Sequence, residues 1–440
     1  MKFIFAAALF LSCAYTFAQK PDEILATSNV ANYTVQSLSA EGRKIYENRD
    51  KLLADARTRL LSEMIAETLI DFEAKAQGRT VEQLLTAERS KAAAPTQSQL
   101  QAFYDENRSS LANKTFDEVR DKIAEYLRAE AEQKAVETYV QGLQAKYKFA
   151  AGKDVNAFGL KPTEMLVTVG TKAITVQEFE DKNKFALYDA RAEIYDEVRS
   201  DLESSIFSAL AAEEAKTRGT DLSSLIGTEI TDKLREYTDE ERAGLERAFL
   251  NRLYTKYSVK FLLKEPEPLV QNVSIDDDPV LGSTAAPVTV VMFTDYQCPA
   301  CSKTHPVLKK VVAEFGDKVR LVLRDFPLQK IHPNSFQAAI AANAARAQGK
   351  FAEYIEVLYR NQDALDRASL VKYAADLGLN TKKFELDLSD EKLAAEIRKD
   401  IADGTSYGAS GTPTIFVNGV KVRRISADGF RTAIECALKK

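Results

Sequence analysis

Apolar residues recur at helical spacing through the first half of the chain, from residue 20 to about residue 265. In one stretch Leu53, Arg57, Leu61, Ile65 and Leu69 follow each other in steps of four, so they line one face of a helix. The arginine in this series has an aliphatic stem that packs on apolar neighbours. Because the same half is rich in Ala, Glu, Lys, Arg, Gln and Leu, the pattern predicts an arm that is almost entirely α-helical.

The arm repeats itself, without a gap, at an offset of 141 residues. The apolar stripe Leu61, Ile65 and Leu69 recurs as Leu202, Ile206 and Leu210. Short motifs recur at the same offset, namely Leu25-Ala26-Thr27 as Leu166-Val167-Thr168, Thr34-Val35-Gln36 as Thr175-Val176-Gln177, and Glu73-Ala74-Lys75 as Glu214-Ala215-Lys216. The copies end alike, on Lys146-Tyr147 and Lys256-Tyr257. We therefore predict helical repeat 1 over residues 19–160 and a shortened repeat 2 over residues 161–265.

A different pattern follows the segment Lys264 to Pro268, where alternating proline and charge mark a linker over residues 266–275. The apolar run Val288 to Phe293 predicts a strand that leads into a helix, and residues 318–323 predict a second strand. Residues 334–403 have helical patterns, Asn418-Gly419 predicts a hairpin turn, and residues 430–439 predict a last helix. Residues 276–440 are therefore expected to form an α/β domain with an inserted helical block, which makes the chain multidomain.

The first 18 residues have the pattern of a signal peptide, with Lys2, an apolar run to Leu11, and a cleavage site after Ala18. We expect a periplasmic or secreted protein; the alternative is a lipoprotein modified at Cys13. The net charge of −5 is spread without long blocks of one sign, so nucleic acid is not an expected partner. The expected partners are proteins.

Three cysteines remain after cleavage, and two of them, Cys298 and Cys301, stand two residues apart where the strand turns into a helix. Unpaired backbone N–H groups and the helix dipole favour a thiolate at such a helix N-terminus. Pro299 suits the first helical turn, and Ala300 continues the helix. The pattern predicts a redox pair with Cys298 as the exposed attacking sulfur and Cys301 as the buried resolving sulfur.

Other interpretations of the cysteines carry less weight. With His305 they would supply three metal ligands, but a zinc site needs a fourth. We therefore expect no metal and no organic cofactor. A thioredoxin fold that keeps both sulfurs without turnover is a further alternative. Cys436 lies off the apolar stripe of the last helix, so it is expected to be a spectator or to form an intermolecular disulfide.

Four motifs together resemble the DsbA-like thioredoxin-fold oxidoreductases, over residues 276–440: Phe293 to Cys301, Arg324-Asp325-Phe326-Pro327-Leu328, His332-Pro333-Asn334 and Gly411-Thr412-Pro413-Thr414. The resemblance implies a cis peptide at Thr412-Pro413 that faces the cysteines and leaves backbone groups of Thr412 free to pair with an extended substrate. Two departures stand out. Met292 occupies the place where related enzymes commonly carry a buried acid, and the dipeptide between the cysteines is Pro-Ala, without histidine.

Three side chains are candidates for tuning the cysteines. Asp295 and Asp325 could take a proton from Cys298, although acids in turns are usually solvated. His305 could interact with the thiolate, or it could be a partly exposed helix residue. His332 is expected only to start a helix.

The arm resembles two copies of the N-terminal helical domain of the SurA and PrsA type of periplasmic chaperone and foldase. The features that carry this resemblance are a short strand, a long helix that contains Glu-Ala-Lys and is followed by Gly, and then Leu-Leu. The isomerase domain of those proteins is replaced by more helix, and both histidines lie outside the arm. The resemblance implies binding of unfolded clients; a dimerisation device and a rigid spacer are the alternatives.

The whole pattern predicts an exported enzyme that forms or reshuffles disulfides of exported proteins through Cys298 and Cys301. Its expected partners are cysteine-containing clients, a membrane redox partner that resets the pair, and a second copy in a homodimer. The alternative is a periplasmic holdase chaperone in which the thioredoxin domain is accessory. Oxidase, isomerase and reductase differ in potential and partner rather than in these motifs.

Overall fold

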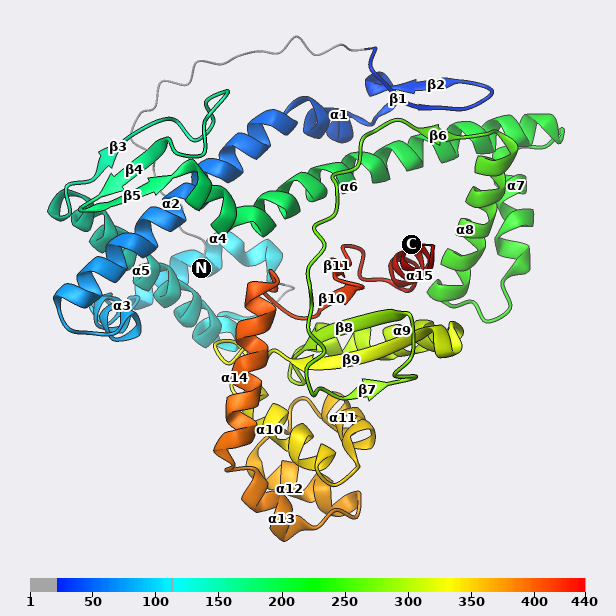
Figure 1. Ribbon diagram of the computed structural model, residues 1–440. Helices are drawn as coiled ribbons and strands as arrows, with labels where there is room; N and C mark the ends of the chain where they lie inside the picture. The colour runs from blue at the N-terminus through cyan, green and yellow to red at the C-terminus, as the bar shows by residue number, and fades with distance from the viewer. Residues whose placement is uncertain (1–21, 112–113, 440) are drawn as a thin grey trace. The chain divides into compact units, whose positions relative to one another are not determined.

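The computed structural model describes residues 22–111 and 114–439, and the chain divides into two units, Met1–Pro266 and Glu267–Lys440. Both are drawn in Figure 1. The predicted signal peptide and the alternative lipidation site Cys13 lie outside the described residues. Within the described ranges, no helix combines the length and the apolar character needed to cross a bilayer.

Helices make up most of the first unit, as the apolar spacing predicts. Threonine side chains cap several of them at the N-terminus, and Thr175 does so for the longest helix by accepting from the backbone N–H of Glu178. The helices are α1 (Ala40–Glu47), α2 (Arg49–Ala76), α3 (Val81–Arg89), α4 (Gln97–Asn107), α5 (Phe116–Lys146), α6 (Val176–Thr217), α7 (Leu222–Glu229) and α8 (Asp239–Lys256).

Short strands join the two copies of the repeat crosswise. The end of repeat 2, β6 (Lys260–Phe261), pairs with β1 (Ile24–Thr27) at the start of repeat 1, whose other neighbour is β2 (Asn32–Thr34). The end of repeat 1, β3 (Ala150–Ala151), pairs with β4 (Met165–Val169) at the start of repeat 2, and β4 pairs with β5 (Lys172–Thr175). All of these pairs are antiparallel. Each sheet therefore contains strands from both copies.

The arm has two main apolar cores, and both combine the copies. The first arm core joins the helices of repeat 1 with the start of repeat 2, including Leu69, Val140, Leu166, Ile174 and Phe179. The second arm core joins the start of repeat 1 with the helices of repeat 2, including Leu25, Tyr33, Leu38, Leu210 and Phe249. The long helices α2 and α6 run side by side between them (Figure 1). The repeats thus exchange their first strands and pack as an intertwined pair.

The repeated motifs have a shared structural role in these cores. Buried Glu73 on α2 accepts hydrogen bonds from Lys146 and Tyr147 at the end of α5. Its counterpart Glu214 on α6 accepts from Lys256 and Tyr257 at the end of α8. Burial alone raises a carboxyl pKa, but these hydrogen bonds outweigh it and hold the pKa of both glutamates at about 2. In both copies the glutamate of Glu-Ala-Lys is therefore buried and is paired with the Lys-Tyr motif, whose lysine side chain is about half exposed.

The second unit is built on a five-stranded sheet in the order β11-β10-β8-β9-β7. The central strands β8 (Val288–Thr294) and β9 (Val319–Asp325) are parallel, whereas β7 (Val280–Leu281), β10 (Thr414–Val417) and β11 (Val420–Lys421) add antiparallel pairs. Its helices are α9 (Pro299–Glu314), α10 (Ser335–Arg346), α11 (Phe351–Arg360), α12 (Arg367–Asp376), α13 (Thr381–Asp387), α14 (Glu391–Ser406) and α15 (Ala427–Leu438). The predicted α/β order with an inserted helical block is confirmed.

Both faces of the sheet are covered, which explains why the central strands are apolar without alternation. Val290 and Met292 face the larger core, with residues of α9, the helical block and α15. Val291 and Phe293 face a smaller core that includes Phe326 and Phe416. Side chains at the C-terminal ends of β8 and β9 are therefore buried on both faces of the sheet. The turn that carries the cysteines begins at the end of β8.

Part of the predicted linker, residues 266–275, lies against the second unit. Val270 forms a bridge with Val420, and the N–H of Gln271 donates to the carbonyl of Gly419 at 2.8 Å. Gly419 has a φ of +81°, and a Cβ there would stand 1.9 Å from the Gln271 carbonyl oxygen, so this turn requires glycine. This part of the predicted linker therefore lies beside the edge strand β11.

Candidate functional site

The two cysteines lie at the start of α9, directly after β8. Cys298 is the N-cap residue and Pro299 is the first helical residue, as the local sequence predicts. Pro299 and Ala300 are exposed, whereas Cys298 is 6% exposed and Cys301 is 0% exposed. The expectation of a buried resolving sulfur is therefore met, but Cys298 is more enclosed than its predicted role as the exposed sulfur suggests.

The environment separates the acidities of the two thiols. The hydrogen bond from the Cys301 thiol, followed by backbone N–H groups of the first helical turn and Thr412, lowers the pKa of Cys298 to about 5, against the opposing effect of burial. The same hydrogen bond and burial raise the pKa of Cys301. At neutral pH the pair therefore holds one thiolate, on Cys298, and one proton, on Cys301.

A second loop lies against the Cys298 sulfur. The Thr412–Pro413 peptide is cis, and the Thr412 carbonyl oxygen is 3.5 Å from the Cys298 sulfur. From the helical block, the amide of Gln362 donates to the carbonyls of Tyr296 and Cys298 at 3.0 and 2.9 Å. The structure therefore brings the predicted cis-proline loop to the cysteines, and it adds Gln362 as a support that the sequence did not reveal.

Asp295 is 1% exposed, which corrects the expectation that acids in this turn are solvated. Its carboxylate accepts from the N–H groups of Gln297 at 2.7 Å and Leu328 at 2.8 Å, and it contacts Nδ1 of His332 at 2.8 Å. His332 precedes α10, which starts at Ser335, so its role is this contact rather than helix initiation alone. Asp295 fixes the turn before Cys298 to the segment after β9.

His305 is 1% exposed, which corrects its interpretation as a partly exposed helix residue. Its ring stacks on Tyr359 with the ring centroids 5.1 Å apart, and burial lowers the pKa of the imidazole. The Tyr359 hydroxyl lies 2.6 Å from the hydroxyl of Thr294, which in turn hydrogen-bonds Cys301. His305 therefore packs on Tyr359, which contacts the Thr294 hydroxyl that hydrogen-bonds Cys301.

Asp325, at the end of β9, is 6% exposed and so is not a solvated acid either. The amide of Asn343 donates to its carboxyl at 2.6 Å, and the Tyr296 side chain hydrogen-bonds the same carboxyl. Burial, followed by the negative charge of Asp400, raises the pKa of Asp325 to about 8. The sequence marked this residue as a candidate, but its burial depends on the helical block.

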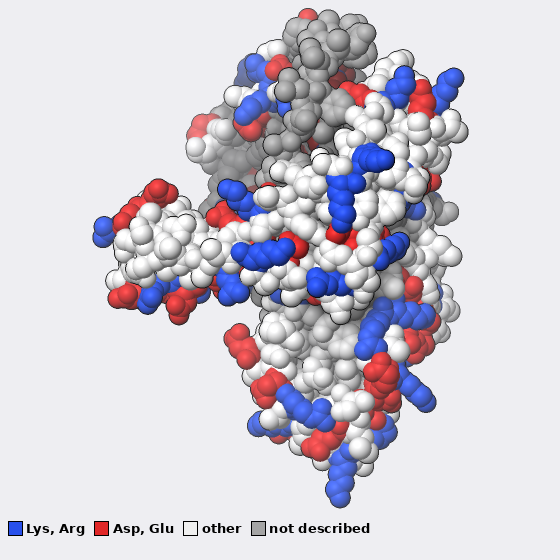
Figure 2. Space-filling model, turned by 90° about the vertical axis from the view of Figure 1, so that its left-hand side faces the viewer, with Lys and Arg blue, Asp and Glu red and all other residues white. Residues whose placement is uncertain are grey.

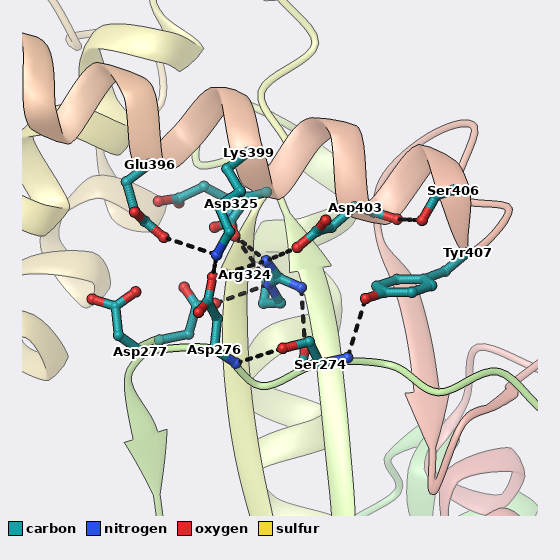
Figure 3. A network of polar contacts seen from close by, with 12 residues as sticks. Ser274, Asp276, Asp277, Arg324, Asp325, Glu396, Lys399, Asp403, Ser406 and Tyr407 are labelled. Atoms are coloured by element: carbon teal, nitrogen blue, oxygen red, sulfur yellow. Dashed lines mark hydrogen bonds and ion pairs between the residues drawn. The ribbon is translucent and has the colours of Figure 1, made fainter.

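The neighbouring Arg324 points to the other face of β9 and is fully buried (Figure 3). Its guanidinium donates to the Ser274 carbonyl at 3.1 Å, to Asp403 at 2.9 Å and to Asp400, and it lies 2.9 Å from Asp278. It thereby ties α14 and the segment before β7 to the central strand. The sequence shows the acids of this cluster, but it does not reveal that they converge on one arginine.

The same cluster contains a possible ligand set for a cation. Oxygen atoms of Asp276, Glu396 and Asp400 lie within 4.8 Å of one another, and this group of described residues does not include the cysteines. However, Lys399 lies between Asp276 and Glu396 (Figure 3). Arg324 forms an ion pair with Asp400. Because two cations of the protein already neutralise these acids, we assign no metal to the cluster.

On the face drawn in Figure 2, basic and acidic side chains are both scattered over the surface. Cys436 on α15 is exposed, as its position off the apolar stripe predicts. Its thiol is accessible, in contrast to the two cysteines of α9.

Residues 274–436 match a family model described as Thioredoxin. Together with the sheet, the cysteine turn and the cis-proline loop, this match supports the predicted thioredoxin fold for residues 274–436. The match does not extend to the helical arm. The resemblance of the arm to SurA and PrsA repeats stays a prediction.

Among curated proteins, the chain is 33% identical over 204 residues to the Na(+)/H(+) antiporter NhaA 1 of Mycobacterium sp. (strain KMS), an alignment that covers 44% of this chain and 33% of that protein. It is 40% identical over 151 residues to the Na(+)/H(+) antiporter NhaA 3 of Salinispora tropica, covering 34% of this chain and 23% of that protein. The chain thus spans at most about a third of the length of these relatives.

Two solved structures illustrate what the fold is similar to. A thioredoxin-like oxidoreductase from Silicibacter pomeroyi has 28% identity and a TM-score of 0.36, with 39% of this chain and 99% of that chain covered. Oxidised BdbD from Bacillus subtilis has 26% identity and a TM-score of 0.36, with 40% of this chain and 100% of that chain covered.

Proposed function

We propose that the protein is an exported thiol–disulfide oxidoreductase that forms or reshuffles disulfides in exported proteins through Cys298 and Cys301. The observation that carries this proposal is the division of the pair into a Cys298 thiolate, with a pKa of about 5, and a protonated Cys301 at one helix N-terminus. Such a division supplies one sulfur that bonds to a client and a second that resolves the bond. The match of residues 274–436 to a thioredoxin model supports the same class.

In the oxidising direction a client thiolate attacks Cys298 of the oxidised pair. The Cys298–Cys301 bond breaks, a client–Cys298 disulfide forms, and Cys301 leaves as a thiolate that takes a proton. A second client thiolate then attacks the client sulfur of the mixed disulfide, and Cys298 leaves as a thiolate. Two electrons pass from the client to the pair, so a membrane redox partner that accepts two electrons must reset it. The reverse sequence reduces a client.

The proposed client groove lies next to the cis-proline loop. Backbone groups of Thr412 stand beside the Cys298 sulfur, where an extended client segment would pair with them. We propose that Pro299 and Ala300, which are exposed at the same helix start, form the other side of this approach. The predicted signal peptide over residues 1–18 would deliver the protein to clients outside the cytoplasm.

The test is disulfide exchange with insulin or scrambled ribonuclease in the presence of a glutathione buffer. Cys298→Ser should abolish exchange, because the sulfur that remains at the site, Cys301, is fully buried and its pKa is raised. Cys436→Ser is the matched control, since it removes an exposed thiol elsewhere in the same unit, and it should retain full activity. Full activity in Cys298→Ser would refute the proposal.

A second candidate function, a holdase activity of the arm, is favoured by exposed apolar side chains on the first unit. The large apolar side chains of this unit that are at least half exposed include Tyr126, Phe158, Met165 and Tyr237. A fragment of residues 20–265 should then suppress aggregation of a reduced, unfolded client at stoichiometric amounts. Absence of suppression at an excess of the fragment would remove this candidate and leave dimerisation or spacing as the role of the arm.

A further inference from the structure

Cys301 must change its protonation state in every cycle of the proposed reaction. It leaves as a thiolate when a client attacks the oxidised pair, and it must lose a proton before it attacks a mixed disulfide on Cys298. The thiol is completely buried and its pKa is raised, so a group inside the protein is needed to exchange this proton with it. Met292, two residues before Thr294 on the same face of β8, has no proton to give.

Two short hydrogen-bonded branches lie between Cys301 and a buried carboxyl group. In one branch the Thr294 hydroxyl bonds Cys301 and lies 2.6 Å from the Tyr359 hydroxyl. In the other branch the Tyr296 side chain bonds the carboxyl of Asp325.

The two branches lie side by side at two places, namely at the strand pair β8 and β9 and at the two tyrosine rings. Thr294 and Asp325 are direct partners in the parallel pair β8 and β9, so their side chains lie on the same face. The rings of Tyr296 and Tyr359 pack with their centroids 5.3 Å apart. Cys301 and the four side chains of the two branches are all buried.

We propose, on the basis of the proposed function, that Asp325 is the internal proton partner of Cys301 and acts through Thr294, Tyr359 and Tyr296. When Cys301 leaves as a thiolate, the carboxyl of Asp325 gives up a proton and becomes a carboxylate while the sulfur becomes a thiol. When Cys301 attacks the mixed disulfide, the proton returns to the carboxylate. Because Asp325 does not touch the sulfur, it is a positioning residue whose effect appears in the pH profile of the Cys301 step.

The surroundings of Asp325 suit this role. At a pKa of about 8 the carboxyl is mostly protonated at pH 7, so it can supply a proton in the oxidising direction. Asn343 holds one of its oxygens in place. The groups that act on it electrostatically are Asp400 on α14, Arg346 on α10, Tyr296 before α9, Tyr359 on α11 and Asp278 before β7.

The experiment separates the two cysteines in the reduced full-length protein with Cys436→Ser as background. An aromatic disulfide that releases a coloured thiol is added in excess and followed by stopped flow. In the first phase the Cys298 thiolate attacks the reagent and releases one coloured thiolate. In the second phase Cys301 loses its proton, bonds to Cys298 and releases the second coloured thiolate.

Asp325→Asn should slow the second phase by about 100-fold at pH 7, in line with loss of general acid–base assistance, and leave the first phase unchanged. In the parent protein the second-phase rate should rise with pH and level off above about pH 8, as the carboxylate forms. This plateau should vanish in Asp325→Asn and reappear in Asp325→Glu. Exposed Asp363→Asn is the matched control and should behave as the parent.

A normal second phase and a normal pH profile in Asp325→Asn would overturn the inference. If that variant does not fold, Tyr296→Phe keeps the ring and removes only the hydroxyl, and it should slow the second phase at least tenfold. A second phase as fast as that of the parent in Tyr296→Phe would then overturn the inference. Absence of the first phase in the parent protein would refute the proposed function itself, so the two failures are distinct.

Discussion

The Nδ1 atom of His332 lies 2.8 Å from Oδ2 of Asp295, and both side chains are largely buried next to the cysteine turn. The same carboxylate accepts the N–H groups of Gln297 and Leu328. Two motifs that are separated in the sequence, the end of β8 and the segment after β9, are therefore joined by one side chain. The position of Cys298 depends on this junction as well as on its own helix.

Asp295→Ala should destabilise the second unit and weaken exchange. The substitution leaves two backbone N–H groups without their acceptor, and an unsatisfied buried donor costs about 1–3 kcal/mol. We expect urea denaturation to show a loss of about 3 kcal/mol in unfolding free energy, with slower reaction of Cys298. The exposed Asp317→Ala is the control and should change stability by no more than about 0.5 kcal/mol. Equal stability of the two variants would contradict the proposed junction.

The reactivity of Cys298 should depend on Cys301. In the parent protein, without Cys436, the alkylation rate by iodoacetamide should rise with pH around a midpoint near 5. Cys301→Ala removes the hydrogen bond that contributes most to the low pKa, so the midpoint should move up by at least one pH unit. Cys301→Ser keeps a donor and should give an intermediate midpoint. An unchanged midpoint in Cys301→Ala would show that the helix N-terminus alone sets the acidity.

The sequence was sufficient for features that depend on local spacing. The cysteine turn follows from an apolar run that ends in Cys-x-x-Cys, and the hairpin follows from Asn418-Gly419 between β-branched residues. The α/β order of the second unit and the helical character of the arm followed from periodicity in the same way. In each of these, the residues that decide the structure are neighbours along the chain.

Features that depend on distant residues were not predictable from one sequence. Asp295, His305 and Asp325 are buried because Leu328, Tyr359 and the helical block fold over them, and turn composition alone suggests solvated acids. Arg324 gathers acids from residues about 46 positions before it and 79 positions after it, as the contacts with Asp278 and Asp403 show. Likewise, the offset of 141 residues shows that the arm is duplicated, but it does not show that the copies exchange strands.

The two units should respond to pH in opposite directions. In the arm the pKa values of Glu73, Glu214 and Glu229 are held at about 2, below their unfolded value, so their contribution to stability is present above about pH 4.5 and is lost as the pH falls through 2. In the second unit burial and Asp400 raise the pKa of Asp278 to about 9. Its contribution is therefore fully present below about pH 4 and is lost as the pH rises through 9.

Scanning calorimetry of the full chain, with limited proteolysis to assign the transitions, measures this difference. The transition of the arm should move to lower temperature in acid, and the transition of the second unit should move to lower temperature between pH 7 and 9. Asp278→Asn should reduce the alkaline change without affecting the acid change, and the part that remains is expected from Asp325, whose pKa is raised to about 8. Parallel movement of both transitions would contradict the assigned pKa shifts.

The exchange of strands between the repeats makes a prediction about fragments of the arm. A fragment of residues 22–160 contains the helices of the first arm core but lacks Leu166, Ile174 and Phe179, which fill that core from repeat 2. The equivalent residues of repeat 1, Leu25, Tyr33 and Leu38, are present in the fragment and belong to the second arm core in the full chain.

Such a fragment should therefore be poorly folded as a monomer and should gain helix content with concentration, because the first strands of one copy can fill the core of another. Circular dichroism and sedimentation over a hundredfold range of concentration test this. A fragment of residues 22–266 contains both cores and should fold independently of concentration. A stable monomer of residues 22–160 with a cooperative unfolding transition would show that the crossed cores are not required, and the repeats would then be independent domains.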